Sequence, residues 1–399
     1  MRLNREIKQR PIEIDEEIER VVRTILNDVR ENGDSAVKKY SDKFDLPFEA
    51  GDPIDDNFLR ILKRTKSQIE EFHKKQISSG FEIQKPNGVI MGQMVRPLAR
   101  VAVYVPGGTA CYPSSVLMNI IPAQLAGVKE IAIFRPQPNN ISKAAANVCG
   151  VNIIYQIGGA QAIAAAAYGT ETIPKFDKIV GPGNSYVAMA KKLVYGEVDI
   201  DMIAGPSEVL IIADETANPE YIAADLMSQA EHDIFASSIL ITTSERIIRQ
   251  TEEAIEKQLQ HLSRAEIIKQ SLENYGSAIL VDNLEKAFEI SNDIAPEHLE
   301  ILTENPYDKL PLVQNAGSIF LGEFTPEPLG DYMSGTNHVL PTGGTAKFYS
   351  PLGVYDFVKY SSYSYYTEKA LKEFKDDVIT FAKAEGFDAH ANSMEVRFK

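Results

Sequence analysis

Residues 100–134 read RVAVYVPGGTACYPSSVLMNIIPAQLAGVKEIAIF and decide the fold class. A short apolar run leads into the glycine pair of VPGG, an apolar helical segment follows, and KEIAIF supplies a second short apolar run. Short Ile/Val/Ala strands that alternate with helices are typical of a parallel sheet covered by helices on its faces. The stretch therefore predicts the first strand–helix–strand unit of an α/β protein.

The same alternation continues along the chain. The helix SKAAANVCG, the strand VNIIYQI, the helix AQAIAAAAYG and the strand FDKIVGPGN are expected to follow in this order. A second series begins with the strand VLIIAD (209–214) and the helix PEYIAADLMSQAEHD (219–233), and ends with the strands SAILVDN, HLEILT and GSIFLG. We expect two α/β lobes in tandem, because 399 residues are too many for one ordinary core.

Helical segments flank the two lobes. An amphipathic pattern predicts a helix that Asp15 caps and that ends at Glu31-Asn32-Gly33, with further helices near 35–40 and 56–75. In the tail, TEKALKEFKDDVITFAKAEG predicts a helix whose apolar face packs either on its own lobe or across a dimer. That face consists of Leu371, Phe374, Val378 and Phe381. The polar segment after the helix should be mobile unless a metal or a partner subunit holds it.

Composition excludes several classes of protein. The formal net charge of −15 argues against nucleic acid as the main partner, because phosphate binding needs clustered cations. No apolar run approaches a membrane span of about 20 residues. The first residues have no apolar core of a signal peptide, and two cysteines cannot build a disulfide framework. We expect a soluble, cytoplasmic protein.

Four of the six histidines lie in unusual polar surroundings, whereas His73 and His261 are expected to be plain surface residues. Gln229 and His232 lie three residues apart on a predicted helix, where they either bind a metal or form a helix-face hydrogen bond. The adjacent pair Glu297-His298 is either a pair of general bases or an ordinary acid and histidine of a loop. Both can meet one substrate only if they lie at a turn.

The other two histidines follow the predicted lobes. Asp331, Asn337 and His338 occur in a Gly- and Pro-rich loop, where metal or substrate binding competes with a purely structural role. Glu385 and His390 lie five residues apart in the tail. If the four clusters converge, their nitrogen and oxygen donors suit Zn²⁺.

Two glycine turns are candidates for cofactor binding. These are YVPGG (104–108) and GPGNSY (181–186), and neither matches the dinucleotide-binding fingerprint. The sequence has no P-loop pattern, and AGPSEV (204–209) is not the nucleophile elbow of serine hydrolases. The residues by themselves predict a metal-dependent α/β enzyme without specifying its reaction.

In their order, nine motifs across residues 10–397 resemble those of the histidinol dehydrogenase family. The motifs are VYVPGG, YPSSVLMNIIPAQLAGV, GGAQAIAAAAYGTETIP, DKIVGPGNSYVAMAKK, IDMIAGPSEVLIIAD, ADLMSQAEHD, APEHLEI, NAGSIFLGEFTPEPLGDYMSGTNHVLPT and EGFDAHANS. The resemblance implies zinc-dependent oxidation of L-histidinol to L-histidine through bound histidinal, with two NAD⁺. It also implies incomplete Rossmann-like lobes and a cytoplasmic homodimer in which the tail of one subunit reaches the site of the other.

The resemblance also implies roles for individual residues. The zinc ligands, one ion per subunit, would be Gln229, His232, Asp331 and His390. Glu297 would activate water and His298 would accept the alcohol proton. Substrate contacts would come from Ser207, Gln229, His232, His298, Asp331, His338, Glu385 and His390, and NAD contacts from Tyr104, Gln161 and Asn184.

The resemblance also divides the chain into four parts. These are an N-terminal helical region that packs with the second lobe (1–103), a first lobe on the NAD side (104–206), a second lobe on the zinc side (207–352) and the tail (353–399). Two features depart from the family: the chain starts late, and the segment 135–152 is short. One alternative is a related zinc- and NAD-dependent dehydrogenase of another polar alcohol, such as a sulfonated diol. The other is a metal-binding or interaction protein without catalysis.

Overall fold

The computed structural model describes residues 2–8, 16–45, 53–107 and 111–399. The chain forms two compact units, of which the first comprises Met1–Gln76 with Leu98–Phe357 and the second Ile77–Pro97 with Val358–Lys399. The first unit contains two parallel five-stranded sheets with helices on their faces. The predicted tandem α/β fold is therefore confirmed, while the four-part division of the chain stays a prediction.

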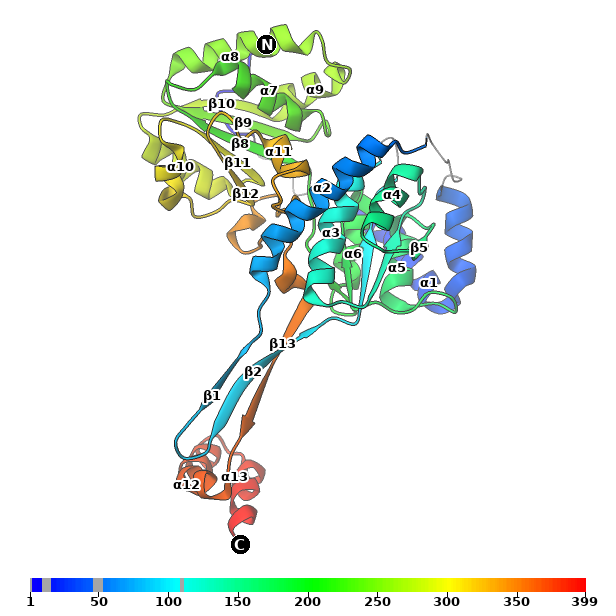
Figure 1. Cartoon of the computed structure of the whole chain (residues 1–399), viewed down its shortest axis with the longest axis vertical. Helices are drawn as coiled ribbons and strands as arrows, with labels where there is room; N and C mark the ends of the chain where they lie inside the picture. The colour runs from blue at the N-terminus through cyan, green and yellow to red at the C-terminus, as the bar shows by residue number, and fades with distance from the viewer. Residues whose placement is uncertain (1, 9–15, 46–52, 108–110) are drawn as a thin grey trace. The chain divides into compact units, whose positions relative to one another are not determined.

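The first sheet has the strand order β5-β4-β3-β6-β7 (Figure 1). Its strands are β3 (Arg100–Tyr104), β4 (Glu130–Phe134), β5 (Ile154–Tyr155), β6 (Lys178–Val180) and β7 (Asp199–Ile200). Val101 and Val103 face a core with α2, α3 and α4, whereas Ala102 and Tyr104 face a core with α1, α5 and α6. These helices are α1 (Glu16–Phe44), α2 (Asp56–His73), α3 (Pro113–Ala126), α4 (Asn140–Val148), α5 (Gly159–Tyr168) and α6 (Ser185–Val194).

The second sheet repeats this strand order as β10-β9-β8-β11-β12. Its strands are β8 (Glu208–Ala213), β9 (Ser237–Thr242), β10 (Gly276–Leu280), β11 (His298–Leu302) and β12 (Ser318–Leu321). Val209 and Ile211 face a core with α7 (Pro219–Ala230), α8 (Glu245–Leu259) and α9 (Ala265–Tyr275), and Leu210 and Ile212 face α10 (Leu284–Ile294). Consecutive residues of a strand point to opposite faces of the sheet. Both faces of this sheet carry apolar side chains, because helices cover both faces.

The N-terminal helices pack differently from our expectation. Gly33 breaks α1 with a φ of 50° and a ψ of −131°, as its sequence predicts, while the expected cap Asp15 lies outside the described residues. The apolar face of α1 packs on the alanine-rich α5 and on α6, and α2 packs on the first lobe as well. The expected packing with the second lobe is therefore wrong for α1, because the small side chains of α5 admit a close helix. The second lobe is contacted by α2, whose Thr65 hydroxyl donates to Met333 Sδ at 3.1 Å, and by the chain start, where the Asn4 amide donates to the Gly276 carbonyl at 3.0 Å.

The second unit contains a three-stranded antiparallel sheet that the sequence did not predict. Its strands are β1 (Phe81–Gln84), β2 (Ile90–Pro97) and β13 (Val358–Tyr365), with β2 in the middle. The predicted tail helix is α12 (Glu368–Ala384), and the polar segment after it, which we expected to be mobile, forms α13 (Asp388–Glu395). The side chains of Phe374, Val378 and Phe381 are 37%, 40% and 69% exposed, so the described residues of this chain cover that face of α12 only in part.

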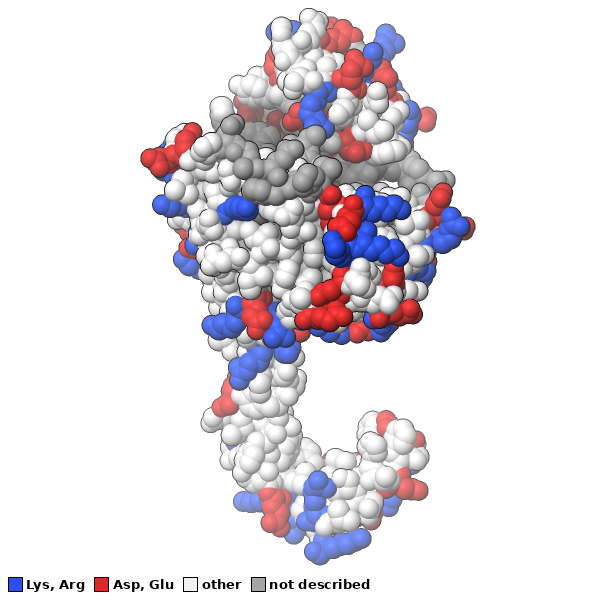
Figure 2. Space-filling model, turned by 90° about the vertical axis from the view of Figure 1, so that its right-hand side faces the viewer, with Lys and Arg blue, Asp and Glu red and all other residues white. Residues whose placement is uncertain are grey.

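Shorter elements complete the chain. They are α11 (Glu327–Tyr332) and the 3₁₀ helices Lys74–Gln76, Pro306–Leu312, Thr345–Lys347, Val354–Phe357 and Val396–Phe398. Among the described residues, no helix is both long and apolar enough to cross a membrane. Acidic and basic side chains are mixed on the face that Figure 2 shows.

Candidate active site

The first residues of β8 and β11 lie side by side and place the predicted catalytic pair. In the parallel pairing of these strands, His298 is opposite Val209. Ser207 directly precedes β8, and Glu297 directly precedes β11. Glu297 and His298 therefore lie at a turn that enters a strand, as predicted, and both are buried.

Glu208 contacts both members of this pair. Its backbone amide donates to Glu297 Oε2 at 2.9 Å, and its Oε2 accepts from the Glu297 amide at 3.3 Å. The backbone carbonyl of Glu208 lies 2.9 Å from Nδ1 of His298. Because a carbonyl oxygen only accepts, this contact places the imidazole proton of His298 on Nδ1 and leaves the lone pair on Nε2.

Burial keeps the His298 imidazole neutral. The side chain is 4% exposed, and desolvation lowers its pKa to about 4. The negative charge of Asp331 opposes this shift, while His232 and His338 add to it. A neutral imidazole with a lone pair on Nε2 can accept a proton at neutral pH.

Two carboxyl groups of α11 face this imidazole. Glu327 Oε1 lies 3.7 Å from His298 Nε2, and burial together with Asp331 raises the pKa of Glu327 to about 8. Burial alone would raise the pKa of Asp331, but hydrogen bonding and the charge of His338 hold it below its ordinary value. Asp331 Oδ1 lies 3.6 Å from Nδ1 of His338. Residue 327 was not predicted from the sequence, because Asp331 was expected in a Gly- and Pro-rich loop, whereas both residues lie on α11.

The donor atoms at this site suit a metal ion. Single ligand atoms of His298, Glu327 and Asp331 lie within 4.8 Å of one another. Gln229 is 1% exposed, and its Oε1 accepts no hydrogen bond from any described residue. A buried carbonyl oxygen without a donor is costly, and a cation would satisfy it. The residues present therefore fit a metal such as zinc.

The predicted zinc ligands come from different parts of the chain. Gln229 lies in the last turn of α7, but His232 lies beyond the end of this helix at Ala230 and is exposed. The helical turn continues to His232, whose backbone amide donates to the Gln229 carbonyl at 3.2 Å, so the shared metal binding of these two residues stays a prediction. The chain then turns where the Asp233 carboxylate accepts the Phe235 amide at 2.8 Å. His390 lies on α13 and Glu385 at the end of α12, both in the second unit.

A second layer of buried acids lies behind these residues, and the sequence analysis did not single it out. Asp225 precedes Gln229 by one helical turn, and Glu300 follows His298 by two positions on β11. Burial raises the pKa of Asp225 to about 6 and that of Glu300 well above its ordinary value. Glu300 Oε1 also accepts the backbone amide of Glu327 at 3.0 Å, so the layer connects α7, β11 and α11.

The residues predicted to contact NAD lie at or after the ends of strands of the first sheet. Tyr104 ends β3, Gln161 lies in the first turn of α5, and Asn184 caps α6 by accepting the Val187 amide at 3.1 Å. The Tyr104 hydroxyl accepts the Gly159 amide at 3.0 Å, and burial raises the pKa of Tyr104 to about 12. Gln161 is 1% exposed, and its Nε2 has no partner among the described residues. Of the three, Gln161 is therefore the residue with an unused donor.

His73 is fully buried, with Nδ1 2.7 Å from Gln76 Oε1, so the expectation that it is a surface residue is wrong, whereas His261 is exposed as expected.

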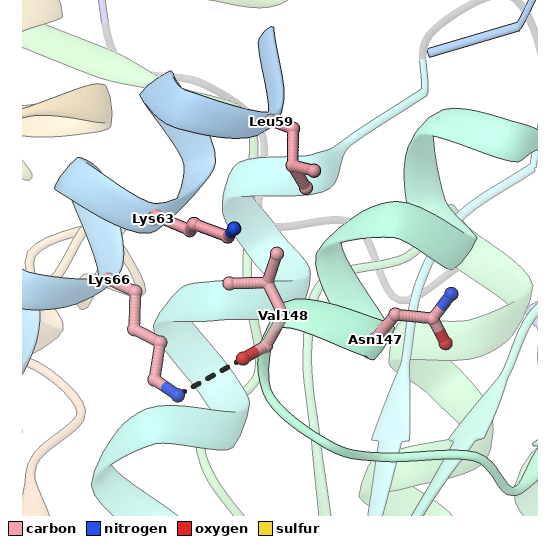
Figure 3. Close-up of a pocket in the computed structure, with 5 residues that line it drawn as sticks. All are labelled: Leu59, Lys63, Lys66, Asn147 and Val148. Carbon is pink, nitrogen blue, oxygen red and sulfur yellow. Dashed lines mark hydrogen bonds between the residues drawn. The ribbon is translucent and has the colours of Figure 1, made fainter. Parts of the chain in front are cut away.

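A cavity of about 350 Å³ lies between α2 and α4 (Figure 3), where Lys66 Nζ donates to the Val148 carbonyl at 3.0 Å. No predicted site residue lines this cavity.

Comparison with known proteins points to one family. The family model described as histidinol dehydrogenase matches residues 8–398. A histidinol dehydrogenase of Lactococcus lactis is 60% identical, covering 98% of this chain and 95% of that protein, and one of Aquifex aeolicus is 52% identical over 96% and 93%. The crystal structure of histidinol dehydrogenase from Elizabethkingia anophelis has a TM-score of 0.92 at 40% identity, covering 98% of this chain and 94% of that one.

A weaker likeness concerns the fold alone. The structure of a putative aldehyde dehydrogenase from Burkholderia cenocepacia has a TM-score of 0.51 at 14% identity, covering 87% of this chain and 86% of that one. The shared arrangement of α/β lobes does not identify a site, because one fold hosts many chemistries.

Proposed function

The chain belongs to the histidinol dehydrogenase family, and we propose that it oxidises L-histidinol to L-histidine at the site that Glu297 and His298 form. The reaction removes four electrons and uses two NAD⁺ in turn. The observation that carries the proposal is the buried, adjacent pair of a carboxylate and a neutral imidazole with a defined tautomer. The alternative polar alcohol is not favoured by the comparisons.

His298 serves the first oxidation. Its Nε2 lone pair accepts the hydroxyl proton of histidinol as the carbon–hydrogen bond gives up a hydride. The proton on Nδ1 remains hydrogen-bonded to the Glu208 carbonyl, which stabilises the imidazolium that forms. The products of this step are the aldehyde, a protonated His298 and one reduced nicotinamide.

Glu297 serves the second oxidation. Its carboxylate takes a proton from water, and the resulting hydroxide adds to the aldehyde carbon to give the hydrate anion. This anion transfers its carbon-bound hydrogen as a hydride to the second NAD⁺ and becomes the carboxylic acid. The hydrogen bond from the Glu208 amide to Oε2 holds the Glu297 carboxylate in place for this proton transfer.

Gln229, His232, Asp331 and the tail residue His390 would hold the zinc ion. Its chemistry when bound is to fix the imidazole and amine of the substrate, which keeps the aldehyde from leaving between the two steps. The buried, unpaired Oε1 of Gln229 supports this assignment. We assign substrate contacts to Ser207, His338 and Glu385 as well.

NAD⁺ supplies the hydride acceptor and belongs at the first lobe. The unpaired Nε2 of Gln161 supports a polar contact there, beside Tyr104 and Asn184. Each of the two NADH molecules must leave before the next cofactor enters. The small polar substrate and this cofactor fit a cytoplasmic enzyme.

We propose a homodimer in which each tail serves the other subunit. The exposed apolar face of α12 supports this arrangement, because an amphipathic helix must cover such a face. The tail belongs to the second unit, which has its own three-stranded sheet. Glu385 and His390 would then complete the site of the partner subunit.

The proposed reaction is tested by counting its products. Purified protein loaded with zinc receives a limiting amount of L-histidinol and excess NAD⁺, and NADH is counted at completion. We expect two NADH per histidinol, no NADH after chelation, and recovery when zinc is returned. No NADH from the zinc-loaded protein would refute the function, and turnover of a sulfonated diol alone would favour the alternative alcohol.

A further inference from the structure

We propose that Glu208 is a positioning residue that holds Glu297 and the loop of His338 in place for oxidation of the aldehyde. The inference rests on the proposed function and adds a residue to it. Glu208 is 7% exposed at the first position of β8, and its carboxylate has contacts on two sides. Oε2 accepts the backbone amide of Glu297, and Oε1 accepts the backbone amide of Gly343 at 3.1 Å.

The two amides belong to different parts of the site. Glu297 precedes β11, whereas Gly343 follows His338 by five residues in the long loop after α11. A further hydrogen bond, from the Gly205 amide to Thr342 Oγ1 at 2.6 Å, fastens the same loop to the segment before β8. Gly343 has a φ of 63°, which suits glycine and lets its amide turn toward the carboxylate.

A carboxylate is the group that this position requires. It offers an acceptor oxygen to each of two N–H donors, and hydrogen bonds to a charged acceptor are the stronger kind. The amide of glutamine would offer one oxygen and turn an NH₂ group toward the second N–H. Glu208→Gln therefore keeps the size of the side chain and breaks one of the two contacts.

The two oxidation steps depend on Glu208 in different ways. His298 is oriented by the backbone carbonyl of residue 208, which every substitution at this position retains. Glu297 depends on both parts of residue 208: the backbone amide, which every substitution also retains, donates to Glu297 Oε2, and the side-chain carboxylate accepts the backbone amide of Glu297. Loss of that contact should therefore slow aldehyde oxidation more than alcohol oxidation.

The test compares the two half-reactions in matched variants. Glu208→Gln and the control Glu304→Gln, an exposed glutamate just beyond β11, are each supplied with zinc, excess NAD⁺ and either histidinol or histidinal. We expect Glu208→Gln to slow histidinal oxidation roughly 10- to 100-fold while the first hydride transfer from histidinol changes much less. Glu304→Gln should match the wild type in both half-reactions.

A second variant covers the case in which Glu208→Gln does not fold. Glu208→Asp keeps both acceptor oxygens on a shorter side chain, so it should show the same selective loss to a smaller degree. Equal slowing of both half-reactions in a folded variant, or no slowing in either, overturns the inference. A wild-type protein that forms no NADH would instead refute the proposed function.

Discussion

At the scale of single residues, His298 shows how its surroundings set a chemical role. The sequence identifies the Glu297-His298 pair, but its tautomer depends on a carbonyl that lies ninety residues earlier in the chain. The low pKa of His298 likewise follows from burial, which only the folded chain provides. Residue type and order were therefore predictable, whereas protonation was not.

Zinc content distinguishes two sets of possible ligands. We expect His298→Asn to bind zinc normally and to lose roughly 10²- to 10⁴-fold in alcohol oxidation, because it removes a proton acceptor. Asp331→Asn should lose zinc as well as activity. Metal analysis of the dialysed variants measures this, and a His298→Asn protein without zinc would place His298 among the ligands with Glu327 and Asp331.

His73 should make folding stability depend on pH. Its Nδ1 hydrogen bonds Gln76, its Nε2 lies 3.4 Å from Asn337 Nδ2, and burial lowers its pKa below the ordinary 6.5. The unfolded chain therefore binds the proton more readily, so stability is full above about pH 6.5 and is lost as pH falls toward the lower folded pKa. We expect His73→Gln to cost about 1–3 kcal/mol at neutral pH and to flatten this loss.

Urea unfolding at several pH values measures this contribution of His73. The exposed His261 provides the control, since His261→Gln should leave both the stability and its pH dependence unchanged. An unchanged acid slope in His73→Gln would contradict the assignment.

At the scale of elements, the residues proposed to bind NAD and those proposed for catalysis lie at opposite ends of the parallel strands in their two sheets. Tyr104 ends β3 and Asn184 follows β6, whereas His298 begins β11 and Ser207 precedes β8. Parallel sheets usually bind ligands beyond the carboxyl ends of their strands, so the second lobe departs from the general rule. The alternation of strands and helices was readable in the sequence, but the edge that carries the chemistry was not.

A buried ion pair supports the glycine turn after β6. Lys191 Nζ pairs with Asp201 and donates to the Gly181 carbonyl at 2.9 Å, and Asp201 Oδ2 accepts the Gly181 amide at 2.7 Å. Lys191→Met should cost about 3–5 kcal/mol, because it leaves a buried carboxylate without its partner. We also expect a higher KM for NAD⁺, since Asn184 lies in the same turn.

The double variant Lys191→Met/Asp201→Asn provides the check on this ion pair. It removes both charges, so it should recover part of the lost stability and of the NAD⁺ affinity. Thermal unfolding and NAD⁺ titration report the two effects. A double variant that is less stable than Lys191→Met would contradict the charge-based explanation.

At the scale of the whole molecule, the sequence predicted the two lobes but missed the sheet of the second unit. All four residues of β1 are exposed, so no apolar run in the sequence predicts this strand. The pairing of β13 with β2 joins segments more than 250 residues apart, which no local pattern reveals. The exposed face of α12 was visible as an amphipathic pattern, yet its partner was left open between its own lobe and a second subunit.

Subunit mixing tests the exchange of tails. Glu297→Gln and His390→Ala proteins should each be inactive alone when activity is measured as histidine formation, because each lacks one part of every site. If the tail serves the partner, a mixed dimer has one intact site, and random exchange restores about a quarter of wild-type activity. No recovery after verified subunit exchange would show that each tail serves its own subunit.

The division of labour between Glu297 and His298 is tested most directly by counting NADH in Glu297→Gln. The variant keeps the proton acceptor for the alcohol and removes the base for the water. With limiting histidinol and excess NAD⁺, we expect one NADH per histidinol and accumulation of histidinal, against two in the wild type. Two NADH per histidinol at an unchanged rate in the variant would contradict the assignment of Glu297.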